Sequence, residues 1–593
     1  NKASTNLSFD DRVLDGMNLC GNMKFLTSNL SLLFLFSCSI DSIYHPNVLA
    51  AAARTPSLFG VSAAAAISSS PLSCRGGGES NNETTDKCKS NDSLLQLILQ
   101  EIQSSITQSH ETIPADDDSK NDIISIAKSS FASHLPTQKS EDAWTFLNGL
   151  SSSNTFVSDV WQKRPLLIRR KETVLVMGKK DDNEDDEGDG WVDGLFTVED
   201  DLRGIDGTYI SGHRTADILR NGTKTDTWEF RSIKDDMTRK TTWEEVKEAL
   251  EGGTIYFNTA GSFWPTLGSL CLLTTEAFGL PANVNVYITP PGVTTSVPPH
   301  TDRQDVIVFQ TGGAKRWRVY APPPRRKGVD PLNRGKAGDV LSFEELGEPL
   351  IDAVIKRGDV LYVPAGFPHT TDTCTVVDDS DGEKDVAADK VFDETSVHLT
   401  MGLDTHVWAL TYAHMRWSLL QRVGKNFQLN IEDDEAYWAA MSAIPVGFLG
   451  GDEGRHFWKN IREEGGGGEL DEKYKLRVIE DLKRVMIQLE PNRWIVDEGG
   501  SDEEAREPLP TDEEIGDVVD YFVRDHLLPL RGIQEEMFRD VDPYSEETII
   551  KAYKGTQKQN AAMEKFGAFS KNEAMRRSFE QSRLAREEKT KGM

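Results

Sequence analysis

Pro299-His300-Thr301-Asp302 carries most of the structural information in this chain, together with one later run, Gly358-Asp-Val-Leu-Tyr-Val-Pro-Ala-Gly-Phe-Pro-His369. Side chains two apart on a β-strand project to the same side, so His300 and Asp302 can approach one ion while Thr301 points away. His369 follows an apolar run and a proline/glycine turn, where a buried strand would end. The two stretches therefore predict strands that bring His300, Asp302 and His369 together.

Two histidines and one carboxylate can occupy one face of a metal ion and leave its other positions open. This ligand set is typical of non-heme Fe(II) oxygenases. Chance is the competing explanation, because a chain with 11 histidines and many aspartates contains about one accidental His-x-Asp/Glu triplet. The residues around the triplet decide between the two interpretations.

A predicted hairpin follows the first motif. Val306 to Gln310 reads as a strand, Thr311 to Ala314 as a glycine turn, and Lys315 to Tyr320 as a second strand. Lys315 shares one face of that strand with Trp317 and Val319, and burying a lysine is costly without an anion. Two roles are open for this lysine. It could extend to water from the strand end, or it could be the charge partner of a carboxylate ligand near the metal.

Two more strands, Val284 to Thr289 and Ser396 to Met401, alternate between apolar and polar residues. Polar faces directed inward suggest a barrel whose interior holds a site. The alternative for each strand alone is a solvent-facing side of an antiparallel sheet.

The stretch from about residue 144 to residue 403 resembles the Jumonji-C, cupin-like oxygenases, and within them the ribosomal oxygenases, which include bifunctional lysine-specific demethylases and histidyl-hydroxylases. The order of six segments carries this resemblance: Trp161 to Ile168, Asn285 to Gly292, His300 to Asp302, Gly313 to Tyr320, Gly358 to His369 and Ser396 to Thr400.

The resemblance implies a mainly β core, a double-stranded β-helix (jelly roll or cupin) with flanking helices, followed by a mostly α C-terminal region. It implies Fe(II), 2-oxoglutarate as co-substrate, and O2. The implied roles are iron ligation by His300, Asp302 and His369, 2-oxoglutarate binding by Lys315, Asn285, Ser396 and Thr400, and substrate contact by Tyr287.

The implied activity is hydroxylation of a protein side chain, with a histidine of a ribosomal protein as the expected target. Histone lysine demethylation by the same fold and a non-catalytic cupin-like scaffold are the alternatives. A cupin isomerase is a further rival that would not need Lys315. Two residues depart from the family pattern, Thr301 between the ligands and Arg303 after them. They leave iron binding intact and bear on the peptide substrate.

Net charge is −30, so direct binding of DNA or RNA is not expected. The charge suits a basic protein partner such as a ribosomal protein or a histone tail. The competing explanation places the acids in solvated loops, as in residues 181–187 and 502–504. The six cysteines contain no Cys-x-x-Cys pair, and four of them precede residue 89, so the sequence predicts no zinc site.

We expect six regions along the chain. They are a leader and candidate targeting segment (1–70), a disordered linker with a helix at Leu94 to Ile106 (71–138), the catalytic domain (139–403), a helical region that could form a homodimer (404–490), a helical and winged-helix-like region (491–560), and a charged tail (561–593). The apolar run Leu30 to Cys38 is too short to cross a bilayer. The resemblance implies the nucleus or nucleolus, whereas a genuine leader would direct the chain to a plastid or the secretory route.

Overall fold

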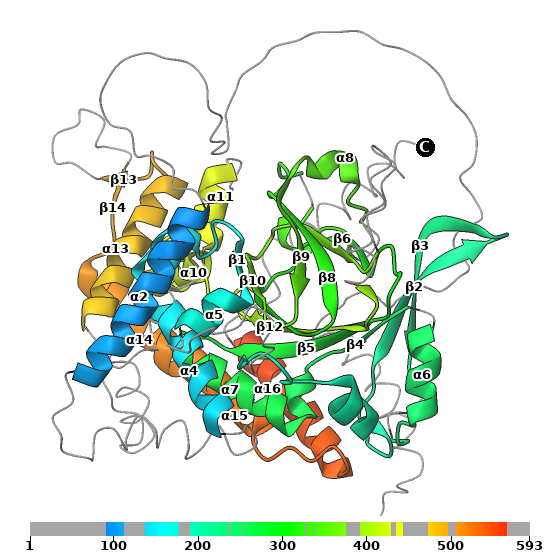
Figure 1. Ribbon diagram of the computed structural model, residues 1–593. Coiled ribbons are helices and arrows are strands. Elements are labelled where there is room, and N and C mark those ends of the chain that lie inside the picture. Colours follow the sequence, from blue (N-terminus) through cyan, green and yellow to red (C-terminus); the bar gives the residue numbers. More distant parts are fainter. Residues whose placement is uncertain are drawn as a thin grey trace, which may run out of the picture.

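A computed structural model describes residues 91–111, 137–176, 190–374, 392–427, 434–442, 472–495 and 506–565, apart from positions 235, 237, 252, 327–328 and 337–338. Two β-sheets lie at its centre, with helices on the outer side of the larger one (Figure 1). The large sheet has the order β1 (Leu166–Ile168), β10 (Val360–Val363), β7 (Asp305–Gly312), β12 (Ser396–Leu403), β5 (Ala282–Thr289), β4 (Thr254–Phe257), β2 (His213–Arg220), β3 (Thr223–Ser232). The small sheet has the order β6 (Val297–His300), β11 (His369–Asp372), β8 (Ala314–Tyr320), β9 (Pro349–Lys356).

All neighbouring strands in the two sheets are antiparallel. Alternation along β7 divides the core, because successive side chains project to opposite faces. Val306 and Val308 face the small sheet and pack with Trp317 and Val319, whereas Phe309 belongs to the core on the helical side. The predicted mainly β, cupin-like core with flanking helices is confirmed.

The predicted hairpin is wrong in its pairing. Both strands exist as β7 and β8, but β7 pairs with β10 and β12 in the large sheet, while β8 pairs with β11 and β9 in the small one. Gly313 makes the crossing with a φ of +55°, a conformation that costs glycine little. A Cβ there would lie 2.6 Å from the Thr395 carbonyl oxygen. The glycine turn therefore connects two layers rather than two partners.

A long antiparallel pair extends the large sheet beyond the small one. Strands β2 and β3 end the strand order and project from the body of the molecule (Figure 1). We call this pair the β2–β3 arm. Its first strand is held by β4, where His213 lies opposite Tyr256.

Two N-terminal helices pack together beside the large sheet. In α2 (Asn91–Glu111) Leu94, Ile98 and Ile102 are buried, and Ile102 closely approaches Gly149 of α4 (Thr137–Ser152). The expected helix at residues 94–106 therefore exists and belongs to the folded body. This part of the segment expected to be a disordered linker is an ordered packing element, because its apolar stripe is covered.

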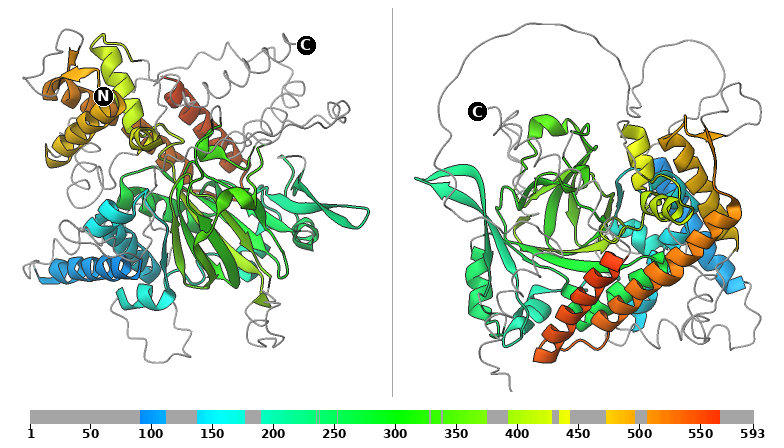
Figure 2. Two further views of the ribbon diagram at one scale, coloured as in Figure 1. Left: turned by 90° about the horizontal axis from the view of Figure 1, so that it is seen from above. Right: turned by 180° about the vertical axis from the view of Figure 1, so that it is seen from behind.

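The region after β12 is mostly α, as expected. Its helices are α10 (Tyr412–Arg422), α11 (Asp434–Met441), α13 (Glu472–Leu489), α14 (Asp512–Phe522), α15 (Leu528–Phe538) and α16 (Glu546–Lys565), with a π turn at Val523–Leu527. Helix α15 packs on α7 (Pro265–Phe278), where Arg531 forms a buried ion pair with Glu276. Gln534 also accepts a hydrogen bond from the backbone N–H of Ala282, at 3.2 Å. Helix α15 thus belongs to the layer of helices on the outer side of the large sheet (Figure 2).

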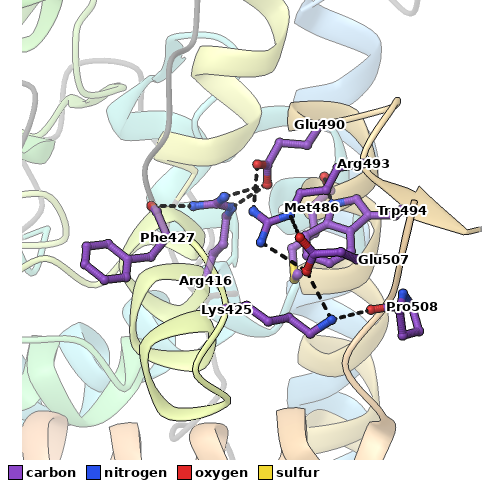
Figure 3. Close-up of polar contacts among 9 residues, drawn as sticks. All are labelled: Arg416, Lys425, Phe427, Met486, Glu490, Arg493, Trp494, Glu507 and Pro508. Carbon is purple, nitrogen blue, oxygen red and sulfur yellow. Dashed lines mark hydrogen bonds and ion pairs between the residues drawn. The ribbon is translucent and has the colours of Figure 1, made fainter. Parts of the chain in front are cut away.

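A cluster of charges joins α10 to the end of α13 (Figure 3). The buried Arg416 guanidinium donates to Glu490 at 2.5 Å and to the Phe427 carbonyl at 3.2 Å. Arg493 pairs with the same glutamate at 2.9 Å and lies over the Trp494 ring at 4.4 Å. The cluster fixes a two-residue parallel strand pair, β13 (Trp494–Ile495) with β14 (Glu507–Pro508). A winged helix in residues 491–560 and a homodimer interface in residues 404–490 stay predictions.

The remaining described elements are short. They are α5 (Arg170–Val176), α6 (Trp243–Glu251), α8 (Phe343–Leu346), and the π or 3-10 turns Phe156–Val160, Val198–Leu202, Arg203–Ile205, Ala260–Ser262 and Pro331–Asn333. No described helix is long and apolar enough to cross a membrane. The leader (1–70), both acidic runs and residues 566–593 of the charged tail lie outside the described residues.

Candidate metal centre

Three side chains from neighbouring strands of the small sheet converge. His300 ends β6, Asp302 follows it by two residues, and His369 begins β11 directly opposite His300. Oδ2 of Asp302 lies 3.8 Å from Nε2 of His300 and 3.4 Å from Nε2 of His369. Their candidate ligand atoms all lie within 4.8 Å of one another. The structure thus places the three predicted ligands as one metal site requires.

Backbone carbonyls orient both imidazole rings. Nδ1 of His300 lies 2.9 Å from the Pro298 carbonyl oxygen, and Nδ1 of His369 lies 3.1 Å from that of Phe367. Donation from each Nδ1–H leaves the Nε2 lone pair directed at the site. Burial lowers the pKa of His300 to about 3 and also lowers the pKa of His369. Both rings are therefore neutral near pH 7, which is the form that binds metal.

Lys336 is the charge partner of Asp302. Its ammonium pairs with Oδ1 of that carboxylate, while Oδ2 faces the histidines. Burial alone would raise the pKa of Asp302, but Lys336 and the two histidines outweigh burial and lower it. Sequence reasoning did not single out Lys336. No periodic pattern marks Lys336, since it lies in the loop after Gly335.

Thr301 points away from the metal ligands, as the alternation predicted. Its hydroxyl donates to the Pro331 carbonyl oxygen at 3.1 Å and accepts from the Arg334 backbone N–H at 2.8 Å. This residue therefore fastens the loop that carries Lys336 to the ligand strand. Arg303 is half-buried and pairs with Asp330 at 2.6 Å. Both departures from the family pattern thus have structural partners.

Lys315 lies inside the barrel with 1% of its surface exposed. Its ammonium donates to the Thr289 hydroxyl at 2.8 Å, and that oxygen lies 3.1 Å from the Thr254 hydroxyl. Burial lowers the pKa of Lys315 to about 7, and Asp372 opposes the shift. The expectation that this lysine faces inward is confirmed. A buried ammonium held by a hydroxyl suits an incoming carboxylate.

The other predicted residues lie on the inner face of the large sheet. Register pairs Asn285 with Thr400, Tyr287 with His398, and Thr289 with Ser396. Asn285 accepts a hydrogen bond from the Thr259 backbone N–H at 3.0 Å, and Ser396 accepts one from Gln310 at 2.9 Å. Ser396 lies opposite Thr289, whose hydroxyl accepts the hydrogen bond of Lys315. The roles predicted for these residues stay proposals.

Aromatic residues close the site, and sequence reasoning missed one of them. The Trp317 ring stacks on His369 with centroids 5.7 Å apart, and it meets His398 in a T-shaped contact with centroids 5.3 Å apart. His398 is buried, and burial and then Lys315 lower its pKa well below the usual value. Its position two residues after Ser396 on an alternating strand was the available signal.

Comparison with known proteins finds similarity in the part of the chain that holds the candidate site. The family model described as "JmjC domain" matches residues 270–379, which include the three converging side chains and Lys315. Residues 270–379 are therefore similar to JmjC domains. A Drosophila mojavensis protein named "Bifunctional lysine-specific demethylase and histidyl-hydroxylase NO66" is 40% identical to the chain over 119 residues, 20% of this chain and 13% of that protein.

The chain is also similar to proteins named as ribosomal oxygenases. "Ribosomal oxygenase 1" of Danio rerio is 31% identical over 221 residues, 37% of this chain and 35% of that protein. The matched part of the chain thus spans well under half of these two relatives. The solved Escherichia coli ribosomal oxygenase YcfD aligns with 67% of this chain and 76% of its own at 15% identity and a TM-score of 0.27. Because that score is low, the fold assignment rests on strand topology and the domain match.

The residues present fit the metal and co-substrate that were expected. Two neutral imidazoles and one ionised carboxylate on one side are a donor set for Fe(II) with open positions. Lys315 offers a positive group to one carboxylate, as a dicarboxylate such as 2-oxoglutarate requires. Lys315 of β8 and His369 of β11 lie on adjacent strands of the small sheet.

Proposed function

We propose that this protein is an Fe(II)- and 2-oxoglutarate-dependent dioxygenase that hydroxylates a protein side chain, with a histidine of a ribosomal protein as the preferred target class. The observation that carries the proposal is the presence of two complementary sites in one barrel. One is the convergent His300, Asp302 and His369; the other is the buried ammonium of Lys315. A scaffold or an isomerase has no use for both.

Different residues of the chain have different roles in this reaction. When bound, Fe(II) with 2-oxoglutarate and O2 supplies oxidising power that inserts one oxygen atom into a C–H bond, with succinate and CO2 as co-products. His300, His369 and Oδ2 of Asp302 would hold the metal, and Lys336 holds Oδ1 of that aspartate. This division favours binding through a single carboxylate oxygen and leaves other metal positions to small molecules.

The remaining residues bind, orient and exclude water. The Lys315 ammonium and the Thr289 hydroxyl would bind the distal carboxylate of the co-substrate through charge-assisted hydrogen bonds. Trp317 and Val319 are buried beside them and keep solvent from the reacting centre. Tyr287 lies on the opposite inner face and is half-buried, so it can contact the substrate side chain.

Lysine demethylation is the second candidate, and the name of the Drosophila relative supports keeping it. Hydroxylation of an N-methyl group would release formaldehyde, so the same site could serve both reactions. The strongly acidic chain supports a basic protein as partner in either case. The nucleus or nucleolus is the location that we propose, and a fluorescent fusion of the full chain would separate it from a plastid or the secretory route.

One assay tests the proposal. The full chain is loaded with Fe(II) without oxygen, given 2-oxoglutarate and then O2, and incubated with ribosomal-protein and histone peptides that are read by mass spectrometry. Addition of one oxygen to a histidine supports hydroxylation, whereas loss of a methyl group from lysine supports demethylation. Absence of 2-oxoglutarate binding, with Lys315→Ala equal to the unmodified protein, would contradict both.

A further inference from the structure

The two residues that flank Asp302 both bind one loop, residues 330–336, which we call the strap. Thr301 holds the strap with its hydroxyl and with its backbone N–H, which donates to the Arg334 carbonyl oxygen at 3.1 Å. Arg303 forms an ion pair with the aspartate that begins the strap, at 2.6 Å. These are the two residues that depart from the family pattern. The strap is therefore fixed to the chain on both sides of one metal ligand.

The strap also lies directly against the backbone of β6. Gly335 has a φ of +71°, and a Cβ there would lie 2.1 Å from the Pro299 carbonyl oxygen and 2.9 Å from Cα of His300. Glycine is the residue that permits both this conformation and this approach. The buried Arg334 guanidinium and the Gly335 backbone N–H donate to Asp339 at 2.7 and 2.9 Å. The end of the strap thus has a fixed place beside the strand that carries the metal ligands.

Lys336 is the last residue of the strap, and its ammonium meets the carboxylate of Asp302. The pair involves Oδ1, whereas Oδ2 lies 3.4 Å from Nε2 of His369. Both side chains of the pair are about four-fifths buried, with 20% and 22% of their surfaces exposed. Because water reaches them only in part, the charge of the ammonium acts more strongly on nearby ions than a surface charge would.

An ammonium in this position acts with opposite sign on the two molecules that the site would bind. It repels a divalent cation held by Oδ2 and the two imidazoles, and it shares the negative charge of Asp302, which would otherwise serve the metal alone. It attracts a dicarboxylate that binds to the metal-loaded site, because the dicarboxylate adds two negative charges. The same charge therefore weakens one binding step and strengthens the next.

We propose that Lys336 is a positioning residue that couples metal binding to co-substrate binding: it disfavours the metal alone and favours the metal together with a dicarboxylate. This inference rests on the proposed function and adds how one residue outside the ligand set regulates the same site. Thr301 and Arg303 keep the ammonium in place through the strap. The metal is then held most firmly when the anionic co-substrate is also present.

Two affinities, measured separately and without turnover, test the coupling. Mn(II) alone is titrated into the full chain, and free Mn(II) is read by electron paramagnetic resonance. 2-Oxoglutarate is then titrated by calorimetry into the protein saturated with Mn(II). Lys336→Met is expected to bind Mn(II) about tenfold more tightly and 2-oxoglutarate about tenfold more weakly. Lys336→Arg keeps the charge and should keep both affinities close to those of the unmodified protein.

Matched variants separate this charge from general effects. Lys356→Met removes one positive charge from an exposed position on β9 and should change neither affinity. Thr301→Val removes both hydrogen bonds of the hydroxyl to the strap, so it should shift the two affinities in the same directions as Lys336→Met, by about threefold. Thr301→Ser keeps the hydroxyl and is its control. Circular dichroism verifies that each variant is folded.

The sign of the two changes decides the outcome. If both affinities of Lys336→Met moved in the same direction, or if either one stayed unchanged, the inference would be overturned, because a residue that only supports the ligand geometry weakens both. The proposed function is contradicted by a different result, the absence of Mn(II) binding by the unmodified chain with or without 2-oxoglutarate. A chain that binds both molecules but shows no opposite changes keeps the metal centre and loses the coupling.

Discussion

Lys315 and Arg531 are both cations with almost no exposed surface, but they have opposite surroundings. Arg531 pairs with Glu276 across the contact between α15 and α7 and reaches Glu535 at 3.2 Å. Lys315 has a neutral hydroxyl as its hydrogen-bond partner. A buried cation that pairs directly with a carboxylate holds elements together, whereas one whose hydrogen-bond partner is a neutral hydroxyl retains its attraction for an anion from outside. The comparison separates a structural charge from a binding one.

The largest expected effect is on stability at the structural charge. Arg531→Met should lower the free energy of unfolding by about 3–5 kcal/mol, because Glu276 is left buried without a partner. Urea denaturation of the full chain measures it. The double variant Arg531→Met with Glu276→Leu should recover most of the loss. If Arg531→Met lowered the free energy of unfolding by well under about 1 kcal/mol, Arg531 would not be the structural charge that the comparison with Lys315 requires.

The binding charge should behave in the opposite way. Lys315→Met should weaken 2-oxoglutarate binding about 100-fold, which is the loss of a charged hydrogen bond, while stability stays equal or rises because an unmatched buried charge is gone. Anaerobic calorimetry with Mn(II) measures the affinity. Lys356→Met, on the exposed side of the neighbouring strand β9, is the control and should change neither quantity.

A pH titration sharpens the comparison further. The pKa of Lys315 is about 7 in the folded protein against 10.5 for a free lysine, so the unfolded chain binds more protons between these values. Its contribution therefore makes stability rise with pH across that window, by at most about 1.4 kcal/mol per pH unit. The stability advantage of Lys315→Met should be largest below pH 7 and shrink toward pH 10.5. A constant advantage would mean that the ammonium is not desolvated.

The smallest expected effect concerns the hydroxyl that holds the lysine. Thr289→Val keeps the shape and removes one hydrogen-bond partner, which should weaken 2-oxoglutarate binding about fivefold, or ~1 kcal/mol. Thr289→Ser retains the hydroxyl and serves as the control in the same calorimetric titration. Equal affinities for all three proteins would place the distal carboxylate elsewhere.

Local alternation was enough to foresee which residues face inward. His300 and Asp302 are two apart on an extended chain, and Lys315 shares a strand face with Trp317, so their directions follow from the two-residue period. The pairing of the strands within the sheets does not follow from this two-residue period. The run around Gly313 has the composition of a hairpin turn, yet the chain changes sheets there, because register and pairing depend on residues far away in sequence.

Lys336 could not have been predicted for a related reason. It lies in an irregular loop, and its position beside Asp302 depends on the hydrogen bonds of Thr301 with Pro331 and Arg334. The apolar stripe in the sequence predicted helix α2. Its packing in the core could not be predicted, because the stripe does not identify the residues that cover it. Composition therefore assigned that segment to a linker.

The contact between α15 and α7 has a practical consequence for dissecting this protein. Because Gln534 and Arg531 bind the backbone of β5 and the side chain of α7, a fragment that stops at residue 403 would expose the underside of its own catalytic barrel to water. Expression trials and limited proteolysis should therefore treat the stretch from α2 through α15 as one cooperative unit, with the sequence boundary at residue 403 lying inside it.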